Sequence, residues 1–383
     1  MARLGEICTI VSGTTPKSTQ PEYWDGNLNW VTPAELTDES DIIYESQRKI
    51  TQQAVSDSSL KSFPAGTVLL SSRAPIGKVA IAGTEMYCNQ GFKNLICSEK
   101  IYNRYLYHFL KDKTVYLNSL GRGATFKEIS KSIVENIEIP LPPLDEQHKI
   151  AAVLDKVSDL IAKRRQQLDK LDLLIKSRFI EMFGDPVFNP LGWKKKTLKE
   201  VCIKLNDGTH FSPESFDTGE YKYVTAKNIK ISGFDFTNIT YVPEEVHRPI
   251  YERCNPELGD VLYIKDGVTT GIAMVNTLEE EFTLLSSVAL LKQDRRIMNG
   301  HFLAALLNNE SMYTDIRSNM GGAAITRLTI AKLNTIKVIL PPIELQEQFA
   351  AFVEQADKSK LALQKSLEKL ETLKKALMQE YFG

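Results

Sequence analysis

The chain has 383 residues, 43% hydrophobic and 25% charged, with a formal net charge of −1. This composition excludes a disordered chain and leaves room for two domains. The sequence has no apolar run of the roughly 18 residues that a membrane-spanning helix needs, no signal-peptide pattern, and five cysteines without a CxxC pair. We therefore expect a cytoplasmic protein with reduced thiols. The neutral charge balance is unusual for a duplex-binding protein, which normally shows a basic excess.

Residues 1–143 are expected to form a strand-rich α+β domain. Short β-branched runs bounded by turn residues predict strands at 67–70, 78–82 and 136–139. Residues 103–110 carry helical periodicity between these strands.

Residues 144–184 are predicted to form one long helix. The double proline before it fixes its start, because proline is tolerated at a helix entrance and excluded from the interior. Apolar residues then recur at alternating steps of four and three, interrupted only by Arg164 and Arg178, and this heptad pattern is typical of a coiled coil. The predicted seam residues are Ile150, Leu154, Val157, Ile161, Leu168, Leu171 and Ile175.

A turn-rich connector at 185–196 leads into a second copy of the same organisation. Leu4-Gly5-Glu6-Ile7-Cys8 is repeated as Leu198-Lys199-Glu200-Val201-Cys202, and the Leu-Pro-Pro motif at 141–143 returns at 340–342. We therefore predict a second strand-rich domain over 197–342 and a second long helix over 343–383. Its predicted seam residues are Phe349, Val353, Leu363, Leu367, Leu370 and Leu377.

An unbroken helical stretch of about 37 residues in each copy would span roughly 55 Å, and an amphipathic helix of that length needs an apolar partner. We expect the two helices to pair with each other as an antiparallel coiled coil. The predicted fold is thus α+β, with two strand-rich domains in tandem repeat, each followed by a long helix, and pseudo-twofold symmetry. The alternative is that each helix packs against its own domain as a core element.

Catalytic motifs are not evident. The sequence contains no GxxxxGK[ST], no strand-preceded GxGxxG and no HExxH. Glu220 and Lys222, after Asp207 or Asp217, form at most a weak nuclease-like pattern that could hold Mg²⁺. We expect neither a catalytic residue nor a metal site in this chain.

Several loops combine glycine, a hydroxyl side chain and a cation, which suits binding to an extended anion. Glycine lets backbone N–H groups approach phosphates, and Arg, Asn or Gln can bind base edges with two hydrogen bonds. For any single loop, an ordinary solvated turn is the alternative. The loops lie at 12–17, 71–78, 89–93 and 121–127, and at 207–210, 226–228, 265–271 and 325–327. The candidate DNA-contacting residues are Thr14, Thr15, Lys17, Ser71, Arg73, Lys78, Gln90, Lys93, Arg122 and Lys127 in the first domain, and Thr209, His210, Lys227, Asn228, Lys265, Thr269, Thr270 and Arg327 in the second.

The order of these motifs resembles the specificity (S, HsdS) subunit of type I restriction-modification systems. The motifs are Gly13-Thr14-Thr15-Pro16, Asn89-Gln90-Gly91-Phe92, the two Leu-Pro-Pro motifs with their helices, and Phe183-Gly184-Asp185-Pro186. The resemblance covers essentially the whole chain. The second copy lacks the Asn-Gln-Gly-Phe motif, so contacts do not transfer one to one between the copies.

This resemblance implies a non-catalytic subunit that binds double-stranded DNA. Each target recognition domain would recognise one half of a bipartite target, and the paired helices would act as a ruler for the spacer. The implied partners are two methyltransferase (M) and two restriction/translocase (R) subunits, which use S-adenosylmethionine, ATP and Mg; no cofactor is implied for this chain.

Because the two domains have diverged, we expect an asymmetric target. Because partners can supply phosphate contacts, we expect weak DNA binding by this chain alone. Two alternatives stay open: a coiled-coil scaffold that does not bind DNA, and a self-sufficient Mg-dependent nuclease.

Overall fold

The computed structural model describes residues 1–37, 39–73, 75–123, 127–318 and 327–383. The predicted loops at 71–78, 121–127 and 325–327 are covered only in part, because residues 74, 124–126, 325 and 326 lie outside the described ranges. The chain forms two compact units, which are residues 1–165 with 365–383 (unit 1) and residues 166–364 (unit 2). No helix in the described ranges is long and apolar enough to cross a membrane.

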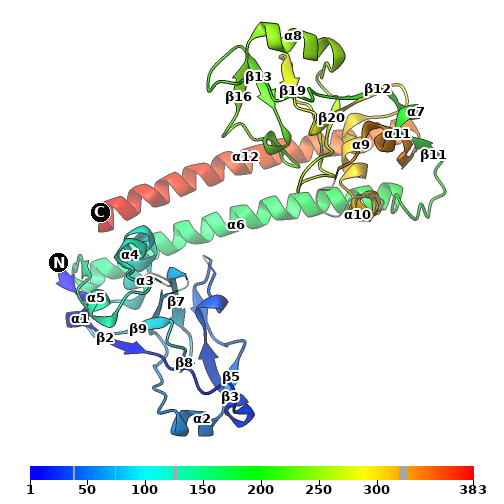
Figure 1. The fold of residues 1–383 in the computed structure, drawn as a ribbon. Coiled ribbons are helices and arrows are strands. Elements are labelled where there is room, and N and C mark those ends of the chain that lie inside the picture. The colour runs from blue at the N-terminus through cyan, green and yellow to red at the C-terminus, as the bar shows by residue number, and fades with distance from the viewer. Residues whose placement is uncertain (38, 74, 124–126, 319–326) are drawn as a thin grey trace. The chain divides into compact units, whose positions relative to one another are not determined.

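The globular part of unit 1 contains a five-stranded sheet in the order β2-β9-β6-β7-β4, a three-stranded sheet β5-β3-β8 and a two-stranded sheet β1-β10 (Figure 1). Its strands are β1 (Ala2–Arg3), β2 (Cys8–Ser12), β3 (Trp24–Val31), β4 (Ile42–Ile43), β5 (Lys49–Ile50), β6 (Val68–Ser72), β7 (Ile76–Ala82), β8 (Tyr87–Cys88), β9 (Phe92–Cys97) and β10 (Glu138–Ile139). Its helices are α1 (Leu4–Ile7), α2 (Gln52–Asp57), α3 (Asn103–Asp112), α4 (Thr114–Leu120) and α5 (Lys131–Glu135), with 3₁₀ turns at Pro21–Tyr23 and Pro33–Glu35.

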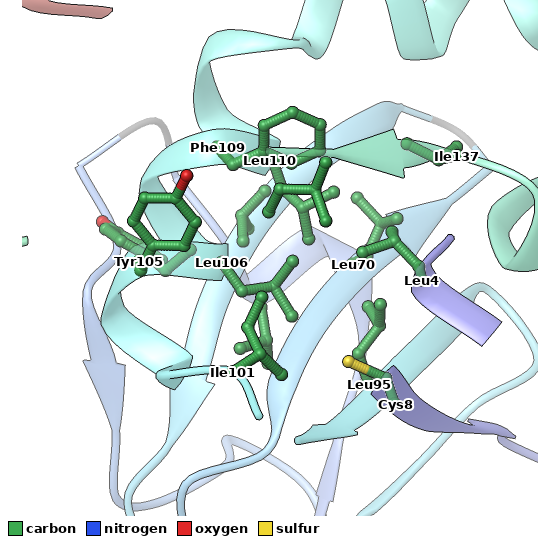
Figure 2. Close-up of a cluster of buried hydrophobic side chains, with 14 of the residues drawn as sticks. Leu4, Cys8, Leu70, Leu95, Ile101, Tyr105, Leu106, Phe109, Leu110 and Ile137 are labelled. Carbon is green, nitrogen blue, oxygen red and sulfur yellow. The ribbon is translucent and has the colours of Figure 1, made fainter. Parts of the chain in front are cut away.

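The core of unit 1 lies between the five-stranded sheet and helix α3. Every residue of β6 is buried, including the two serines that end it, and its first three residues, Val68 to Leu70, are apolar without alternation. Figure 2 shows Leu70 and Leu95 from the sheet beside Leu106 and Leu110 from α3. Gly66 precedes β6 with φ of +84°, a conformation that glycine adopts without steric cost.

Unit 2 contains a four-stranded sheet β12-β20-β17-β18, a three-stranded sheet β16-β13-β19, and two-stranded sheets β11-β21 and β14-β15. Its strands are β11 (Lys195–Thr197), β12 (Cys202–Asp207), β13 (Tyr221–Val224), β14 (Ile229–Lys230), β15 (Gly233–Phe234), β16 (Thr240–Val242), β17 (Val261–Ile264), β18 (Ala273–Val275), β19 (Phe282–Leu284), β20 (Val288–Gln293) and β21 (Lys337–Ile339). Its helices are α7 (Leu198–Val201), α8 (Glu244–Arg253), α9 (Gly300–Leu307), α10 (Glu310–Ser318) and α11 (Ile330–Thr335), with a 3₁₀ turn at Ala226–Asn228.

The two units repeat one topology. Strands β2, β9, β6 and β7 correspond in order to β12, β20, β17 and β18. Each three-stranded sheet also contains one parallel pair, β3 with β8 in unit 1 and β13 with β19 in unit 2. Gly259 repeats the positive φ of Gly66, at +88°. The internal duplication seen in the sequence is therefore a duplication of fold.

Two 40-residue helices, α6 (Leu144–Phe183) and α12 (Ile343–Phe382), contribute to both units (Figure 1). In unit 1 the start of α6, at Leu154, shares a buried cluster with the end of α12, at Phe382. In unit 2 the end of α6, at Phe183, shares a buried cluster with the start of α12, at Phe349. The two helices therefore run antiparallel, as predicted.

The predicted seam residues are all buried or half-buried. The helix ends also belong to the globular cores, because Ile150 and Leu154 share a buried cluster with α3 residues in unit 1, and Phe349 shares one with Phe302 of α9 in unit 2. The start of each helix thus packs against the globular domain that precedes that helix in the chain, in addition to the pairing of the two helices with each other.

Polar residues that interrupt the apolar seam pair between the helices inside each unit. In unit 1 the Nε atom of Arg164 donates to Ser366 Oγ at 3.2 Å. In unit 2 the Nζ atom of Lys360 lies 2.6 Å from Asp172 Oδ1. A polar pair between two helices favours one register, most of all where both side chains are partly buried, as Arg164 and Ser366 are; Asp172 is exposed, so the second pair contributes less.

Candidate nucleic-acid interface

Four loops of unit 1 that the sequence singled out are joined by backbone hydrogen bonds. The N–H of Thr14 donates to the carbonyl of Cys88 at 3.0 Å, which ties the loop after β2 to the loop before β9. The N–H of Ser72 donates to Gly91 at 2.7 Å, and the N–H of Ile129 donates to Ser72 at 2.9 Å. The loops after β2, after β6, before β9 and around residue 128 therefore lie together at one end of the five-stranded sheet.

Most of the predicted contact residues of unit 1 have accessible side chains in this loop cluster. The Thr15 hydroxyl donates to the Gln90 amide oxygen, so these two side chains are held together. Lys78 donates to the carbonyl of Leu36. The exposed members are Thr14, Thr15, Lys17, Gln90, Arg122 and Lys127, and the half-buried members are Arg73 and Lys78.

Ser71 and Lys93 are buried and bonded inside the domain. The Ser71 hydroxyl donates to Pro75 O at 2.7 Å and accepts from the N–H of Lys78 at 2.8 Å, which closes the turn between β6 and β7. The Lys93 ammonium lies 3.0 Å from Glu128 Oε1. Both side chains hold loops in place, and a direct DNA contact by either stays a prediction.

The loops of unit 2 converge in the same way. The N–H of Thr209 donates to Leu284 O at 2.8 Å, the N–H of Lys265 donates to Ser287 O at 2.9 Å, and the N–H of Leu328 donates to Lys265 O at 2.9 Å. This last bond repeats the bond from Ile129 to Ser72 in unit 1. The loops after β12, after β17, between β19 and β20, and around residue 327 are thus gathered at the matching end of the sheet.

Four of the eight predicted residues in unit 2 are exposed, and four are buried. Lys265 lies 2.8 Å from Asp266 Oδ2 and 3.4 Å from Asp207 Oδ2. Asn228 accepts from the N–H of Thr225 at 3.0 Å and so caps a 3₁₀ turn. The exposed residues are His210, Lys227, Thr269 and Arg327, and the buried ones are Thr209, Asn228, Lys265 and Thr270.

A buried lysine therefore supports the loop cluster in both units, but from different strands. Lys93 belongs to β9, whereas Lys265 follows β17, the counterpart of β6. Each ammonium is paired with at least one carboxylate, which offsets the cost of burying its charge. Both copies thus place a buried lysine, paired with a carboxylate, at the loop cluster, but they use residues at different positions.

Unit 2 has an open groove of about 400 Å³ between the loop after β12 and helix α8. Phe211 lies on the groove with 61% of its surface exposed. The Arg253 guanidinium also lines the groove and reaches Asp207 Oδ1 at 3.6 Å, beside His210 at 3.1 Å. No sequence pattern pointed to Arg253. Phe211 directly follows the predicted residue His210, so its position was the available clue.

The domain of unit 1 is held on α6 by a partly buried polar cluster. Arg104 Nε donates to Asp155 Oδ2 at 3.1 Å, and His108 Nε2 lies 2.7 Å from Asp155 Oδ1. Burial opposes ionisation of Asp155, but hydrogen bonds from His108 and Arg104 outweigh it and lower the pKa of this carboxyl. Burial lowers the pKa of His108 in spite of its contact with Asp155.

The residues of the nuclease alternative do not form a cluster of carboxylates. Glu220 is exposed, and the Lys222 ammonium pairs with Glu280. Within the ranges that the structure describes, no three His, Cys, Asp or Glu side chains come together as metal ligands.

Comparisons with known proteins agree with this architecture. The family model for the type I restriction modification DNA specificity domain matches residues 1–172 and 190–375. The chain is 30% identical to the MjaIX specificity subunit of Methanocaldococcus jannaschii over 98% of this chain and 90% of that protein. It is 21% identical to the Escherichia coli EcoKI specificity subunit, over 100% of this chain and 88% of that one.

Solved structures show the same fold. The S subunit of the type I restriction-modification system from M. genitalium matches with a TM-score of 0.63 and 16% identity, over 100% of this chain and 95% of that one. A chain from a structure of type I system assembly and conformational transition matches with a TM-score of 0.58 and 20% identity, over 99% and 96%.

Two copies of a strand-rich domain with converging polar loops, joined to antiparallel helices, define a tandem DNA-specificity protein. The chain belongs to the specificity subunits of type I restriction-modification systems, the proteins that recognise the DNA target in those systems.

Proposed function

We propose that the chain recognises an asymmetric, bipartite target in double-stranded DNA, with one half-site for each unit. The observation that carries this proposal is a loop cluster of matched backbone geometry whose side chains differ between the units. A backbone β-bridge joins Arg73 to Glu128 in unit 1, and the equivalent backbone β-bridge in unit 2 joins Asp266 to Arg327. Because charge and hydrogen-bonding groups decide which base edges are bound, the different side chains at these equivalent positions support two different half-site sequences.

The paired helices are proposed to set the spacer between the half-sites. Each helix has 40 residues, which corresponds to about 60 Å at 1.5 Å per residue. The Lys360–Asp172 and Arg164–Ser366 pairs oppose a change of register. A fixed register fixes the length of the ruler, and half-site centres about one DNA turn (~34 Å) apart are expected for such paired domains.

The chain is proposed to work as the non-catalytic part of a cytoplasmic complex. Its partners would be two methyltransferase subunits, which use S-adenosylmethionine, and two restriction/translocase subunits, which use ATP and Mg. This part of the proposal is supported by the names of the relatives, which are specificity subunits of restriction enzymes, and by the assembly title of one matching structure.

A filter-binding series against salt tests the proposal. The chain, bound to its methyltransferase partner, is expected to lose affinity for duplex DNA steeply as salt rises, because phosphate contacts release counterions. Binding without such a slope would contradict DNA recognition and favour the scaffold alternative. Addition of Mg²⁺ to the purified chain is expected to leave DNA uncut, and cleavage that disappears in Glu220→Gln would support the nuclease instead.

A further inference from the structure

A buried glutamine joins the start of α6 to the globular part of unit 1. Gln147 lies in the first turns of the helix and has no exposed surface. Its Oε1 accepts from the N–H of Tyr102 at 2.9 Å, where α3 begins. Its Nε2 donates to Lys100 O at 3.0 Å and to Pro142 O at 2.9 Å. One side chain therefore connects the domain, the double-proline turn and the long helix.

Gln346 makes the same three bonds in unit 2. Its Oε1 accepts from the N–H of Asn299 at 2.9 Å, and its Nε2 donates to Ile297 O at 3.0 Å and Pro341 O at 2.9 Å. It also has no exposed surface. Apart from the proline, the residues contacted differ between the units, but the contacts use only backbone atoms. The arrangement is thus independent of those side chains and depends on the glutamine.

Glutamine is the residue that this arrangement requires. A primary amide donates two hydrogen bonds and accepts others through its oxygen, so it can satisfy an N–H and two carbonyls at once. Glutamate has no donor when ionised and would place a buried charge against two carbonyl oxygens, and lysine has no acceptor. Asparagine is one methylene shorter and cannot reach all three groups.

Each glutamine acts together with a second contact eight residues further along the helix. In unit 1 this is the bond from Arg104 to Asp155, at 3.1 Å. In unit 2 it is the pair of His301 and Glu354, at 4.0 Å, which is longer. Two polar contacts along one helix restrain the direction of the domain relative to that helix, whereas one such contact alone would allow the domain to rotate about it. Unit 2 consequently depends more on its glutamine.

We propose that Gln147 and Gln346 are positioning residues that fix the direction of each recognition domain on its helix and so restrict the spacer length that the protein accepts. This inference rests on the proposed bipartite recognition of DNA. The amide bonds lie away from the loop clusters, so their loss should alter the relation between half-sites and leave the sequence of each half-site unchanged.

The test uses the full chain with its methyltransferase partner and a library of targets whose spacer is the cognate length or differs by one or two base pairs. In Gln346→Met, which removes all three hydrogen bonds, the ratio of methylation at one-base-pair misfits to methylation at the cognate spacer is expected to rise by at least about tenfold, the scale of a single hydrogen bond. Gln147→Met should show a smaller rise because of the Arg104 contact. The matched control is Gln348→Met, an exposed position two residues further along α12, and it should leave the ratio unchanged.

Hydrogen exchange at the amides of Tyr102 and Asn299 provides a readout independent of DNA, and both should lose protection only in the variant of their own unit. If a variant has lost this protection but keeps the wild-type ratio of misfit to cognate methylation, the inference is overturned. It is also overturned if a variant changes the preferred half-site sequence while its preferred spacer length stays the same. If the methionine variants do not fold, Gln147→Asn and Gln346→Asn are measured in the same way, with the same criteria. If the wild-type protein confers no bipartite methylation, the proposed function itself fails, which is a different outcome.

Discussion

Removal of the buried Lys265 ammonium is expected to destabilise unit 2 severely. The Lys265 side chain is 2% exposed and the Asp207 side chain 5% exposed, so Lys265→Met leaves a buried carboxylate without its ammonium partner. Loss of one member of a buried ion pair costs about 3 to 5 kcal/mol. His210 and Arg253 stay beside Asp207 at 3.1 and 3.6 Å, so we expect the lower figure, about 3 kcal/mol.

Hydrogen exchange followed by mass spectrometry measures this effect unit by unit. A loss of about 3 kcal/mol should accelerate exchange of the slowest amides in β17 and β20 by roughly 150-fold, since 1.36 kcal/mol is a factor of ten. Amides of unit 1 serve as the internal reference. Lys227→Met, at an exposed lysine, should change stability by no more than about 0.5 kcal/mol. Unchanged exchange in β17 and β20 of Lys265→Met would refute the structural role of the buried lysine.

Three further predictions concern the helix contacts and the loops. Phe183→Ala removes a fully buried ring in unit 2, so the free energy of unfolding of that unit should fall by about 3 to 5 kcal/mol in denaturant titrations, and a loss under 1 kcal/mol would contradict the packing. The folded-state pKa of His108 lies below its usual 6.5, so the folded protein favours the neutral ring. Unit 1 should therefore lose stability as pH falls through 6.5 toward the lowered pKa, because the unfolded chain binds the proton first. In thermal unfolding, His108→Gln, which can still donate to Asp155, should lack that loss of stability. Arg122→Ala and Arg327→Ala should each weaken DNA binding of the complex by about 1 to 3 kcal/mol, with base preferences relaxed only in the half-site of their own unit; equal relaxation of both half-sites in competition binding would argue against one half-site per unit.

The local elements of the fold were predictable from the sequence. The heptad spacing and the double prolines predicted both long helices, because helix periodicity and the missing proline N–H act within a few residues. The predicted strand at 67–70 corresponds to β6. The parallel pairs β3–β8 and β13–β19 gave no signal, because their partners lie more than 50 residues apart and pairing over that distance leaves no local pattern.

The candidate site was predictable as a set of loops rather than as individual contacts. Glycine-rich turns with cations indicated which loops gather, but not which cations face solvent. Lys93 and Lys265 look like surface lysines in the sequence, and only their carboxylate partners from other loops reveal that they are buried. Gln147 and Gln346 stand at equivalent positions, four residues after the two Leu-Pro-Pro motifs, but their role depends on backbone atoms and so could not be inferred from residue types.

The most direct test of the proposed function is methylome sequencing of a host with and without this chain, in the presence of its methyltransferase partner. We expect one asymmetric motif of two half-sites separated by a fixed spacer, with methylation that disappears when the chain is deleted. An exchange of residues 1–143 for the recognition domain of a relative should replace one half-site and leave the other half-site and the spacer unchanged. A methylome that is identical with and without the chain would contradict the proposal, as would a contiguous or palindromic motif.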